Sequence, residues 1–321
     1  IAFTFPGQGS QSVGMGAALA AASPAAAAVF AEADAALADS GLGEPLSRLA
    51  WEGPADRLNL TENAQPALLA TSIAYLAALR ERWAARLAAG GPAGPEPIFA
   101  AGHSMGQYSA FVAAGALSLA DGLRLVRARG ELMQASGAGR EGRMAALIGL
   151  DDARLPELIA GASAQGVFGV ANRNAPGQVV VSGERAAVEA SLELARSLGA
   201  RRAIELPVSV AAHSPLMADA AEQMARILAD VPFNDPHPAG LANADARPIT
   251  TAAQARAELV EHLTAGVDWI RAVEAMSAAG VTTFIEIGPG RVLTGLTSRI
   301  ASDAAALATD APNNPDGLAV P

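Results

Sequence analysis

The chain has 321 residues, of which 51% are hydrophobic, and a formal net charge of −10; this length can bury a sizeable core in one large domain, or in one domain carrying a smaller insert. The acidic balance argues against nucleic-acid and anionic-membrane partners, and no apolar run approaches the roughly 20 residues that span a bilayer. The chain has no cysteine and all 22 of its basic residues are arginines, which excludes disulfides, a cysteine nucleophile, a Walker A phosphate loop and a Schiff-base lysine.

The N-terminal part alternates short apolar runs with alanine-rich helical segments. The first residues, IAFTF, are typical of a buried strand and lack the basic segment of a secretory signal, so we expect a cytoplasmic protein. The loop PGQGSQ (6–11) follows, with two glycines that can take positive φ. Beyond it the pattern predicts a buried strand at 98–102 that runs into Ser104, and helices at 14–40, 64–88, 105–114 and 119–135.

The periodicity changes in the middle of the chain. Residues 140–206 follow the order strand, helix, strand, strand, helix, strand, with NAPGQ as the hairpin turn. This order is the split βαβ pattern of a ferredoxin-like subdomain. The tail at 303–321, rich in Ala, Pro, Asn and Asp, is expected to be flexible. Between subdomain and tail the pattern predicts a strand at 282–288, a helix after it, and helices near 214–229, 252–264 and 268–279.

A serine lies between two glycines in GHSMG (102–106), where the predicted strand meets the next helix. A strand, sharp turn and helix around G-x-S-x-G is the context in which the turn holds a serine hydroxyl out as a nucleophile, here Ser104. The backbone N–H of Met105, at the helix N-terminus, can then donate to an oxyanion. In a chain with 32 glycines the motif also arises by chance, so a serine in an ordinary glycine-rich turn stays the alternative.

A serine nucleophile needs a base at neutral pH, and histidine is the usual one. His103 adjoins the serine, so the two side chains diverge, and His237 lies in the proline-rich NDPHPAG loop, where a solvated histidine is expected. His213, in LPVSVAAHSPLM, ends a strand-like run just before a helix and is the favoured base. A core or surface histidine is the alternative for this residue.

One arginine interrupts the apolar face of the segment LRLVRARGELMQ. An arginine at such a position usually pairs with a carboxylate or extends its head group to the surface. The sharper hypothesis for Arg129 is a guanidinium aimed into a cleft, because this group holds a carboxylate through two parallel hydrogen bonds. Spacing alone leaves both interpretations open.

Several longer segments, in this order along residues 1–301, carry a family resemblance. The chain resembles the malonyl-CoA:acyl carrier protein transacylase family, whose pattern the acyltransferase domains of polyketide and fatty acid synthases share. The resemblance rests on these segments together, which are FPGQGSQSVGMG, QPALLATS, GHSMGQYSA, RARGELMQ, MAALIGL, ANRNAPGQVVVSG, LPVSVAAHSPLM and EIGPGRVLTGLTSRI.

The resemblance implies an α/β fold, with an α/β-hydrolase-like core at 1–139 and 207–302 and an inserted ferredoxin-like subdomain at 140–206. It also implies that Ser104 is acylated and that His213 is the base, oriented by a main-chain carbonyl oxygen in place of an acidic third member. Roles for further positions follow from the same motifs: Arg129 would bind the substrate carboxylate, Gln8 and Met105 would supply the oxyanion-hole N–H groups, and Gln65, His103, Asn174 and His262 would support the site.

The implied activity is transfer of malonyl from malonyl-CoA to the phosphopantetheine thiol of acyl carrier protein through a malonyl-serine. It needs no metal and no cofactor, and the protein would act in the cytoplasm as a monomer, with no nucleic-acid or membrane partner. An acyl-thioester hydrolase, or an acyltransferase of different acyl selectivity in a polyketide pathway, would use the same serine and histidine. A binding subunit that had lost activity would be expected to lack one of them.

Three positions depart from the family pattern. Gln107 stands where glutamate is common, and Ala212 stands where a serine commonly precedes the base. His262 occupies the place of a glutamine whose backbone carbonyl orients the catalytic histidine. Because the carrier protein is acidic, we hypothesise that an arginine patch on this acidic chain receives it, and the candidates are Arg124, Arg127, Arg201 and Arg202. A solvated arginine is the alternative for each of them.

Overall fold

The computed structural model describes residues 1–136, 141–208 and 210–310. Its first sheet is parallel throughout and has the order β11-β10-β1-β2. The side chains of these strands are almost all buried or half-buried, as expected for a parallel sheet covered on both faces. The strands are β1 (Ala2–Phe5), β2 (Phe99–Gly102), β10 (Thr283–Glu286) and β11 (Ala305–Ala308).

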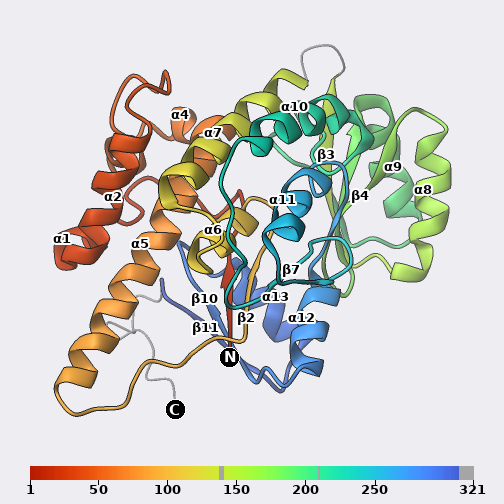
Figure 1. Ribbon diagram of the computed structural model, residues 1–321. Coiled ribbons are helices and arrows are strands. Elements are labelled where there is room, and N and C mark those ends of the chain that lie inside the picture. Colours follow the sequence, from red (N-terminus) through yellow and green to blue (C-terminus); the bar gives the residue numbers. More distant parts are fainter. Residues whose placement is uncertain (137–140, 209, 311–321) are drawn as a thin grey trace.

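Helices from the first 136 residues lie on one face of this sheet, with α1 and α2 at one end of the molecule (Figure 1). The single helix predicted at 14–40 is two helices, because Ser23 accepts a hydrogen bond from Ala26 N–H and caps a new helix that begins with Pro24. The helix expected at 64–88 begins earlier, so Pro66 lies inside it. The bounds are α1 (Ala17–Ala22), α2 (Pro24–Ala36), α3 (Leu46–Glu52), α4 (Ala55–Leu58), α5 (Thr61–Ala88), α6 (Gly106–Ala113) and α7 (Leu119–Ser136).

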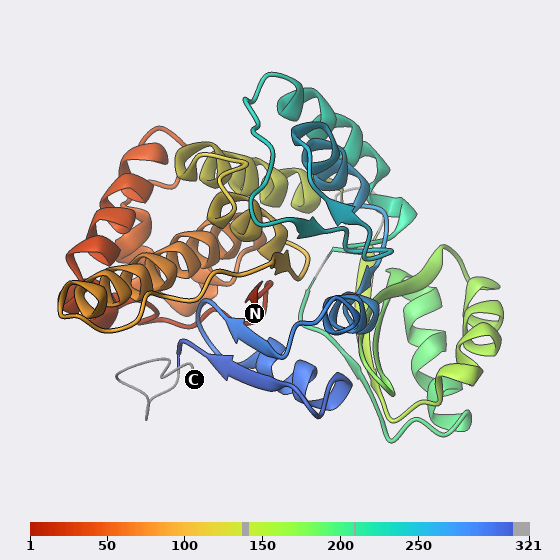
Figure 2. The same ribbon diagram turned by 60° about the horizontal axis from the view of Figure 1, so that its bottom comes forward.

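The second sheet is mixed and has the order β6-β3-β5-β4-β9. Its first four strands pair antiparallel, and β9 adds a parallel edge from a distant part of the chain. Two helices pack against this sheet at the other end of the molecule (Figures 1 and 2). The elements are β3 (Gly142–Ile148), α8 (Leu155–Ser163), β4 (Phe168–Ala175), β5 (Gln178–Glu184), α9 (Arg185–Ser197), β6 (Arg202–Glu205), β9 (Val267–Asp268) and the short 3-10 helix Asp152–Arg154.

The remaining elements come mostly from residues 215–300 and pack against both the N-terminal helices and the two sheets. Thr251 and Gln254 form a capping box that starts α11, since each side chain bonds the other's backbone N–H. The elements are the 3-10 helix Pro215–Met217, α10 (Ala218–Ala229), β7 (Gly240–Leu241), β8 (Pro248–Ile249), α11 (Ala252–Glu261), α12 (Trp269–Ala278) and α13 (Val292–Ile300). None of the helices that the structure describes is both long and apolar enough to cross a bilayer.

The expectation of a flexible tail from residue 303 is wrong for residues 303–310. Here β11 pairs in parallel with β10 along its whole length. Asp310 then accepts hydrogen bonds from the Tyr75 hydroxyl and from Gly290 N–H, both at 2.7 Å. An alanine- and aspartate-rich composition favours disorder when taken alone, but the sheet edge supplies partners that composition does not reveal. The rest of that tail, 311–321, lies outside the described residues.

Candidate active site

The GHSMG motif forms the turn between β2 and α6, at the carboxyl end of the parallel sheet. Both glycines are required by close backbone approach: a Cβ on Gly102 would lie 1.9 Å from Gly106 C, and one on Gly106 would lie 2.2 Å from Phe5 O. Ser104 has φ +53°. A non-glycine residue in this left-handed region costs on the order of 1 kcal/mol or more. The surrounding contacts therefore hold the serine in a strained turn that presents its hydroxyl.

The hydroxyl meets an imidazole from a distant segment, because Ser104 Oγ lies 2.8 Å from His213 Nε2. The other ring nitrogen, His213 Nδ1, lies 2.6 Å from His262 O and 2.9 Å from Ala265 O. Both of those atoms are carbonyl oxygens and can only accept, so Nδ1 carries the proton and Nε2 is left as an acceptor for the serine O–H. This is the tautomer that a general base needs.

The electrostatic surroundings keep this imidazole neutral. Burial, and after it the positive charge of Arg129, lowers the pKa of His213 to about 4. Burial also lowers the pKa of His103, and lowers that of His262 well below its ordinary value. At neutral pH His213 is therefore unprotonated and able to take a proton.

Arg129 extends from α7 and is only 2% exposed. Its Nη1 donates to Gln65 Oε1 at 2.8 Å and its Nη2 donates to Ser104 Oγ at 3.2 Å. No carboxylate pairs with it among the residues that the structure describes, so neither the ion pair nor the surface arginine considered from the sequence is found. A buried guanidinium without a counter-ion, next to a candidate nucleophile, has the charge and the hydrogen-bond donors to bind a carboxylate.

These groups line one cavity of about 440 Å³. Its polar side carries the serine, the histidine and the arginine, and its apolar side combines residues from α7, the second sheet and the segment before His213. That volume suits a small acyl group with part of a thioester chain. The apolar walls are formed by Met133, Met144, Val180, Leu206, Val208, Val210 and Ala212.

The cavity is also lined by two residues, Gln8 and Met105, whose backbone N–H groups are available to a ligand. Gln8 follows β1 and Met105 follows the serine, and neither N–H has an acceptor within the described part of the chain. Of the two glycines expected to take positive φ, Gly9 does so, with φ +106°, and Gly7 does not. Gly7 is needed instead because a Cβ there would lie 2.6 Å from His103 O.

The supporting positions make different kinds of contact. His103 Nε2 lies 2.8 Å from Asn174 Oδ1, which ties the serine turn to β4 of the second sheet. At Gln107, which is fully buried, the side-chain amide accepts from Gly102 N–H and donates to Leu241 O. The ring nitrogens of His262 have no partner among the described residues, and its contact with His213 is made through the carbonyl oxygen.

Three further contacts at the site carry no sequence signal. Asn243, in the loop between β7 and β8, accepts a hydrogen bond from Ser104 N–H at 2.8 Å. Glu258 of α11 accepts from Asn243 N–H at 2.7 Å, and Ala265 supplies the second carbonyl on His213. No motif marks these residues, because each acts over a separation that only the tertiary fold closes.

The four arginines considered for a carrier-protein patch are not equivalent. Arg127 is bound by Glu131, Asn63 and the Glu62 carbonyl, and its side chain is only 13% exposed, so its inclusion was wrong. Arg124 is exposed and pairs with Asp121 on the same helix. Arg201 and Arg202 are exposed in a different part of the fold, where Arg202 is the first residue of β6.

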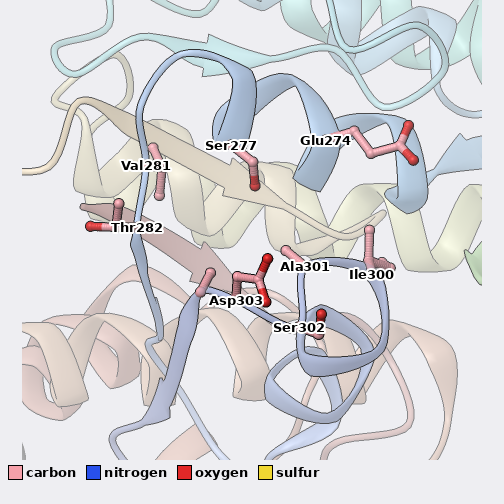
Figure 3. Close-up of a pocket in the computed structure, with 9 residues that line it drawn as sticks. Glu274, Ser277, Val281, Thr282, Ile300, Ala301, Ser302 and Asp303 are labelled. Atoms are coloured by element: carbon pink, nitrogen blue, oxygen red, sulfur yellow. The ribbon is translucent and has the colours of Figure 1, made fainter.

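A second hollow, of about 390 Å³, lies between α12 and the segment that leads into β11 (Figure 3). Glu274, Ser277 and Asp303 line it, and the hydroxyl of Ser277 and the carboxylate of Asp303 point into it. Among its described lining residues there is no histidine or arginine, and none of the predicted site residues. The chemistry expected from the sequence therefore belongs to the first cavity.

Comparison with known proteins agrees with this geometry. The family model described as "Acyl transferase domain" matches residues 2–312. The malonyl CoA-acyl carrier protein transacylase of Escherichia coli K12 is 44% identical over 312 residues, which is 97% of this chain and 96% of that protein. The crystal structure of an acyl-carrier-protein-S-malonyltransferase from Bartonella henselae is 45% identical and superposes with a TM-score of 0.89, covering 97% of this chain and 95% of that one.

A further solved structure holds a type II PKS acyl-carrier protein in complex with its malonyl-transacylase. It is 40% identical to this chain, has a TM-score of 0.86, and covers 96% of this chain and 94% of that one. A family model and relatives that match almost the full length leave no large part of the chain outside the resemblance. The chain belongs to the acyl transferase family, among the malonyl-CoA:acyl carrier protein transacylases.

Proposed function

We propose that this protein transfers malonyl from malonyl-CoA to the phosphopantetheine thiol of acyl carrier protein. The observation that carries the proposal is a continuous set of contacts: Arg129 to Ser104 Oγ, Ser104 Oγ to His213 Nε2, and His213 Nδ1 to His262 O. It joins a receptor for a carboxylate to a hydroxyl and its base, which is what malonyl transfer through serine requires. The near full-length similarity to malonyltransferases supports the same conclusion.

In the first half-reaction His213 Nε2 takes the Ser104 proton while Oγ attacks the thioester carbonyl carbon. The negative oxygen of the tetrahedral intermediate would accept from the N–H groups of Gln8 and Met105. As the intermediate collapses, the carbon–sulfur bond breaks and the imidazolium returns its proton to the departing CoA thiolate. A malonyl ester on Ser104 remains.

The second half-reaction repeats these steps with another thiol. The phosphopantetheine thiol gives its proton to His213 and attacks the ester carbonyl, and Ser104 leaves with the proton that His213 returns. The two halves form a double displacement in which His213 accepts and returns the proton in each half. Water attacking in place of the thiol would make the protein a hydrolase with the same serine and histidine.

Selectivity for a dicarboxylic acyl group would come from Arg129. Its buried guanidinium can bind the free malonyl carboxylate through two hydrogen bonds. Gln65 Oε1 would orient the guanidinium by accepting a hydrogen bond from its Nη1. A hydrolase of simple acyl thioesters has no need of a buried cation at this point. The arrangement therefore favours malonyl transfer over the hydrolase and over acetyl-selective transfer.

The architecture fits the proposal. We interpret the parallel sheet and its helices as an α/β-hydrolase-like core, and residues 140–206 as a ferredoxin-like subdomain inserted into it. The antiparallel order β6-β3-β5-β4 supports this, since it is the order that a βαββαβ unit of that type makes. In this division the core begins with 1–139, resumes at residue 207 and runs beyond 302, because β11 completes its sheet. His103 and Asn174 would then hold the subdomain against the serine turn.

The cellular setting follows the same proposal. Malonyl groups on carrier protein feed fatty acid and polyketide synthesis, and a malonyltransferase would supply either. We propose that the protein acts in the cytoplasm as a monomer, since each group in the proposed mechanism comes from a single chain.

The test is the intact mass of the protein after brief mixing with malonyl-CoA, for wild type and Ser104→Ala, followed by addition of holo acyl carrier protein. We expect a malonyl adduct on wild type only, and its disappearance as the carrier protein gains the same mass. Release of free malonate without any malonyl carrier protein would mean that the protein is a hydrolase.

A further inference from the structure

The candidate nucleophile is held from a direction that the proposed mechanism does not use. Asn243 is 4% exposed, and its Oδ1 accepts from Ser104 N–H at 2.8 Å. Its Nδ2 donates to Gly102 O at 3.0 Å and to Gln107 Oε1 at 3.2 Å. One side chain therefore makes hydrogen bonds to the last residue of β2, to the serine itself and to the first turn of α6. All these partners belong to the strained turn, and they lie more than 130 residues from Asn243 in the sequence.

The backbone of Asn243 is held in turn by α11 and β9. Its N–H donates to Glu258 Oε1 at 2.7 Å, and its carbonyl accepts from Asp268 N–H at 2.7 Å. Glu258 is 2% exposed, and burial raises the pKa of its carboxyl to about 8. At neutral pH this carboxyl is mostly protonated and still offers Oε1 to Asn243.

The same helix is also connected to the other half of the dyad, His213. His262 follows α11 directly, its N–H donates to Glu258 O at 3.0 Å, and its own carbonyl accepts from His213 Nδ1. One rigid element thus reaches the serine through Glu258 and Asn243, and reaches the histidine through the His262 carbonyl. Both members of the dyad are therefore connected by hydrogen bonds to the same helix.

We propose that Asn243 and Glu258 are positioning residues, which fix the Ser104 turn relative to His213 by tying it to α11. The proposal rests on the proposed acylation of Ser104. Its physical basis is that Ser104 occupies a left-handed conformation that an L-residue leaves readily, so the turn needs external hydrogen bonds to stay in place. Because Asn243 occupies the serine's own N–H, that group is unavailable to an oxyanion, which leaves the N–H groups of Gln8 and Met105 for that task.

The experiment compares acylation by malonyl-CoA in single-turnover mixing, followed by intact mass, for wild type, Asn243→Ala, Glu258→Ala and Glu258→Gln. If the cost of leaving a buried hydrogen-bonding group without its partner falls on the transition state, the rate at saturating malonyl-CoA drops by about ten- to a hundredfold. We expect this fall in Asn243→Ala and Glu258→Ala, with the malonyl-CoA concentration at half-saturation changed less than about twofold, since neither side chain lines the cavity. Glu258→Gln keeps a neutral acceptor at the same place and is expected to retain the wild-type rate.

Glu286→Ala is the matched control. Glu286 is also a buried carboxyl, at 1% exposure, but its partners are the N–H groups of Leu293 and Thr294 in α13. This variant is expected to lower the thermal midpoint without changing the acylation rate of the folded protein. Asn243→Ala in the Glu258→Ala background is expected to slow acylation no further than Asn243→Ala alone, because Glu258 reaches the serine through Asn243.

The outcomes separate cleanly. If Asn243→Ala and Glu258→Ala lower the thermal midpoint as the control does and acylate at the wild-type rate, the positioning role is refuted while the serine mechanism stands. If Asn243→Ala does not fold, Glu258→Ala and Glu258→Gln decide, because the proposal requires the first to be slow and the second to be fast. If wild type gains no malonyl on Ser104, the proposed function itself has failed.

Discussion

Replacing Arg129 with alanine should invert the acyl selectivity of the enzyme. The guanidinium is 2% exposed and has no carboxylate partner in the described structure, so the substrate carboxylate would be its counter-ion. Removing one member of a buried ion pair costs about 3–5 kcal/mol. At about 1.4 kcal/mol for each factor of ten, kcat/KM for malonyl-CoA should fall by about two to four orders of magnitude. The acetyl group has no carboxylate for Arg129 to bind, so kcat/KM for acetyl-CoA should stay constant or rise.

The same substitution should move the pH profile, because the charge of Arg129 is the second cause, after burial, that lowers the pKa of His213. Without that charge the pKa rises from about 4 toward the ordinary value of a histidine. The base is active only when unprotonated, so the acid limb of kcat/KM for acetyl-CoA should shift to higher pH in Arg129→Ala. Burial remains, so the shift should be partial.

The assay measures adduct formation by intact mass with malonyl-CoA and acetyl-CoA from pH 4 upward. Arg129→Lys keeps the charge but cannot make two parallel hydrogen bonds, so it should lie between wild type and alanine. Arg226→Ala controls for overall charge, since Arg226 is an exposed arginine paired with Glu222 in α10. Equal losses of kcat/KM with malonyl-CoA and acetyl-CoA would refute the binding of the substrate carboxylate by Arg129. An acid limb at the wild-type pH would refute the effect of the Arg129 charge on the pKa of His213.

Three further expectations follow from the site and the fold. For wild type, kcat/KM for malonyl-CoA should stay flat from neutral pH down to about pH 5 and fall near pH 4, where His213 gains its proton; a midpoint near 6.5 would contradict the burial argument. His262→Gln should acylate within about threefold of wild type, because the carbonyl oxygen and not the ring orients His213; a large loss would assign a task to the imidazole. Ending the chain after Ser302 should lower the thermal midpoint by several degrees, since it removes β11 from the edge of β10; an unchanged midpoint would show that this strand contributes no stability.

Local patterns predicted most of the elements because they depend on neighbours in sequence. The strand at 98–102, the turn at Ser104 and the βαββαβ order of 140–206 all follow from short apolar runs and from glycines whose positions the backbone requires. Helix ends were less accurate. The break at Ser23 needed the recognition that its hydroxyl caps a new helix, and β11 needed a sheet edge that no local pattern shows.

The family resemblance identified the residues of the candidate site, and the tertiary fold determined which of them contact one another. The sequence pointed to Ser104, His213 and Arg129, but from spacing alone an ion pair or a surface position explained the arginine better than a binding role. Its burial without a carboxylate, and its bond to the serine hydroxyl, are properties of packing between α7, α5 and the turn after β2. The Arg127 expectation failed for the same reason, because neighbours on other elements had already bound that side chain.

The sequence by itself determined the chemistry available to this protein: a serine in a glycine-held turn, histidines, arginines as the sole cations, and no thiol or amine nucleophile in any side chain. Those properties reside in residue types and in steps of a few residues. Only the tertiary structure decided the tautomer of His213, its low pKa, and the grip of Asn243 and Glu258 on the serine turn. Each of these arises where atoms many residues apart are brought within hydrogen-bond distance and out of water, and burial then sets their charge.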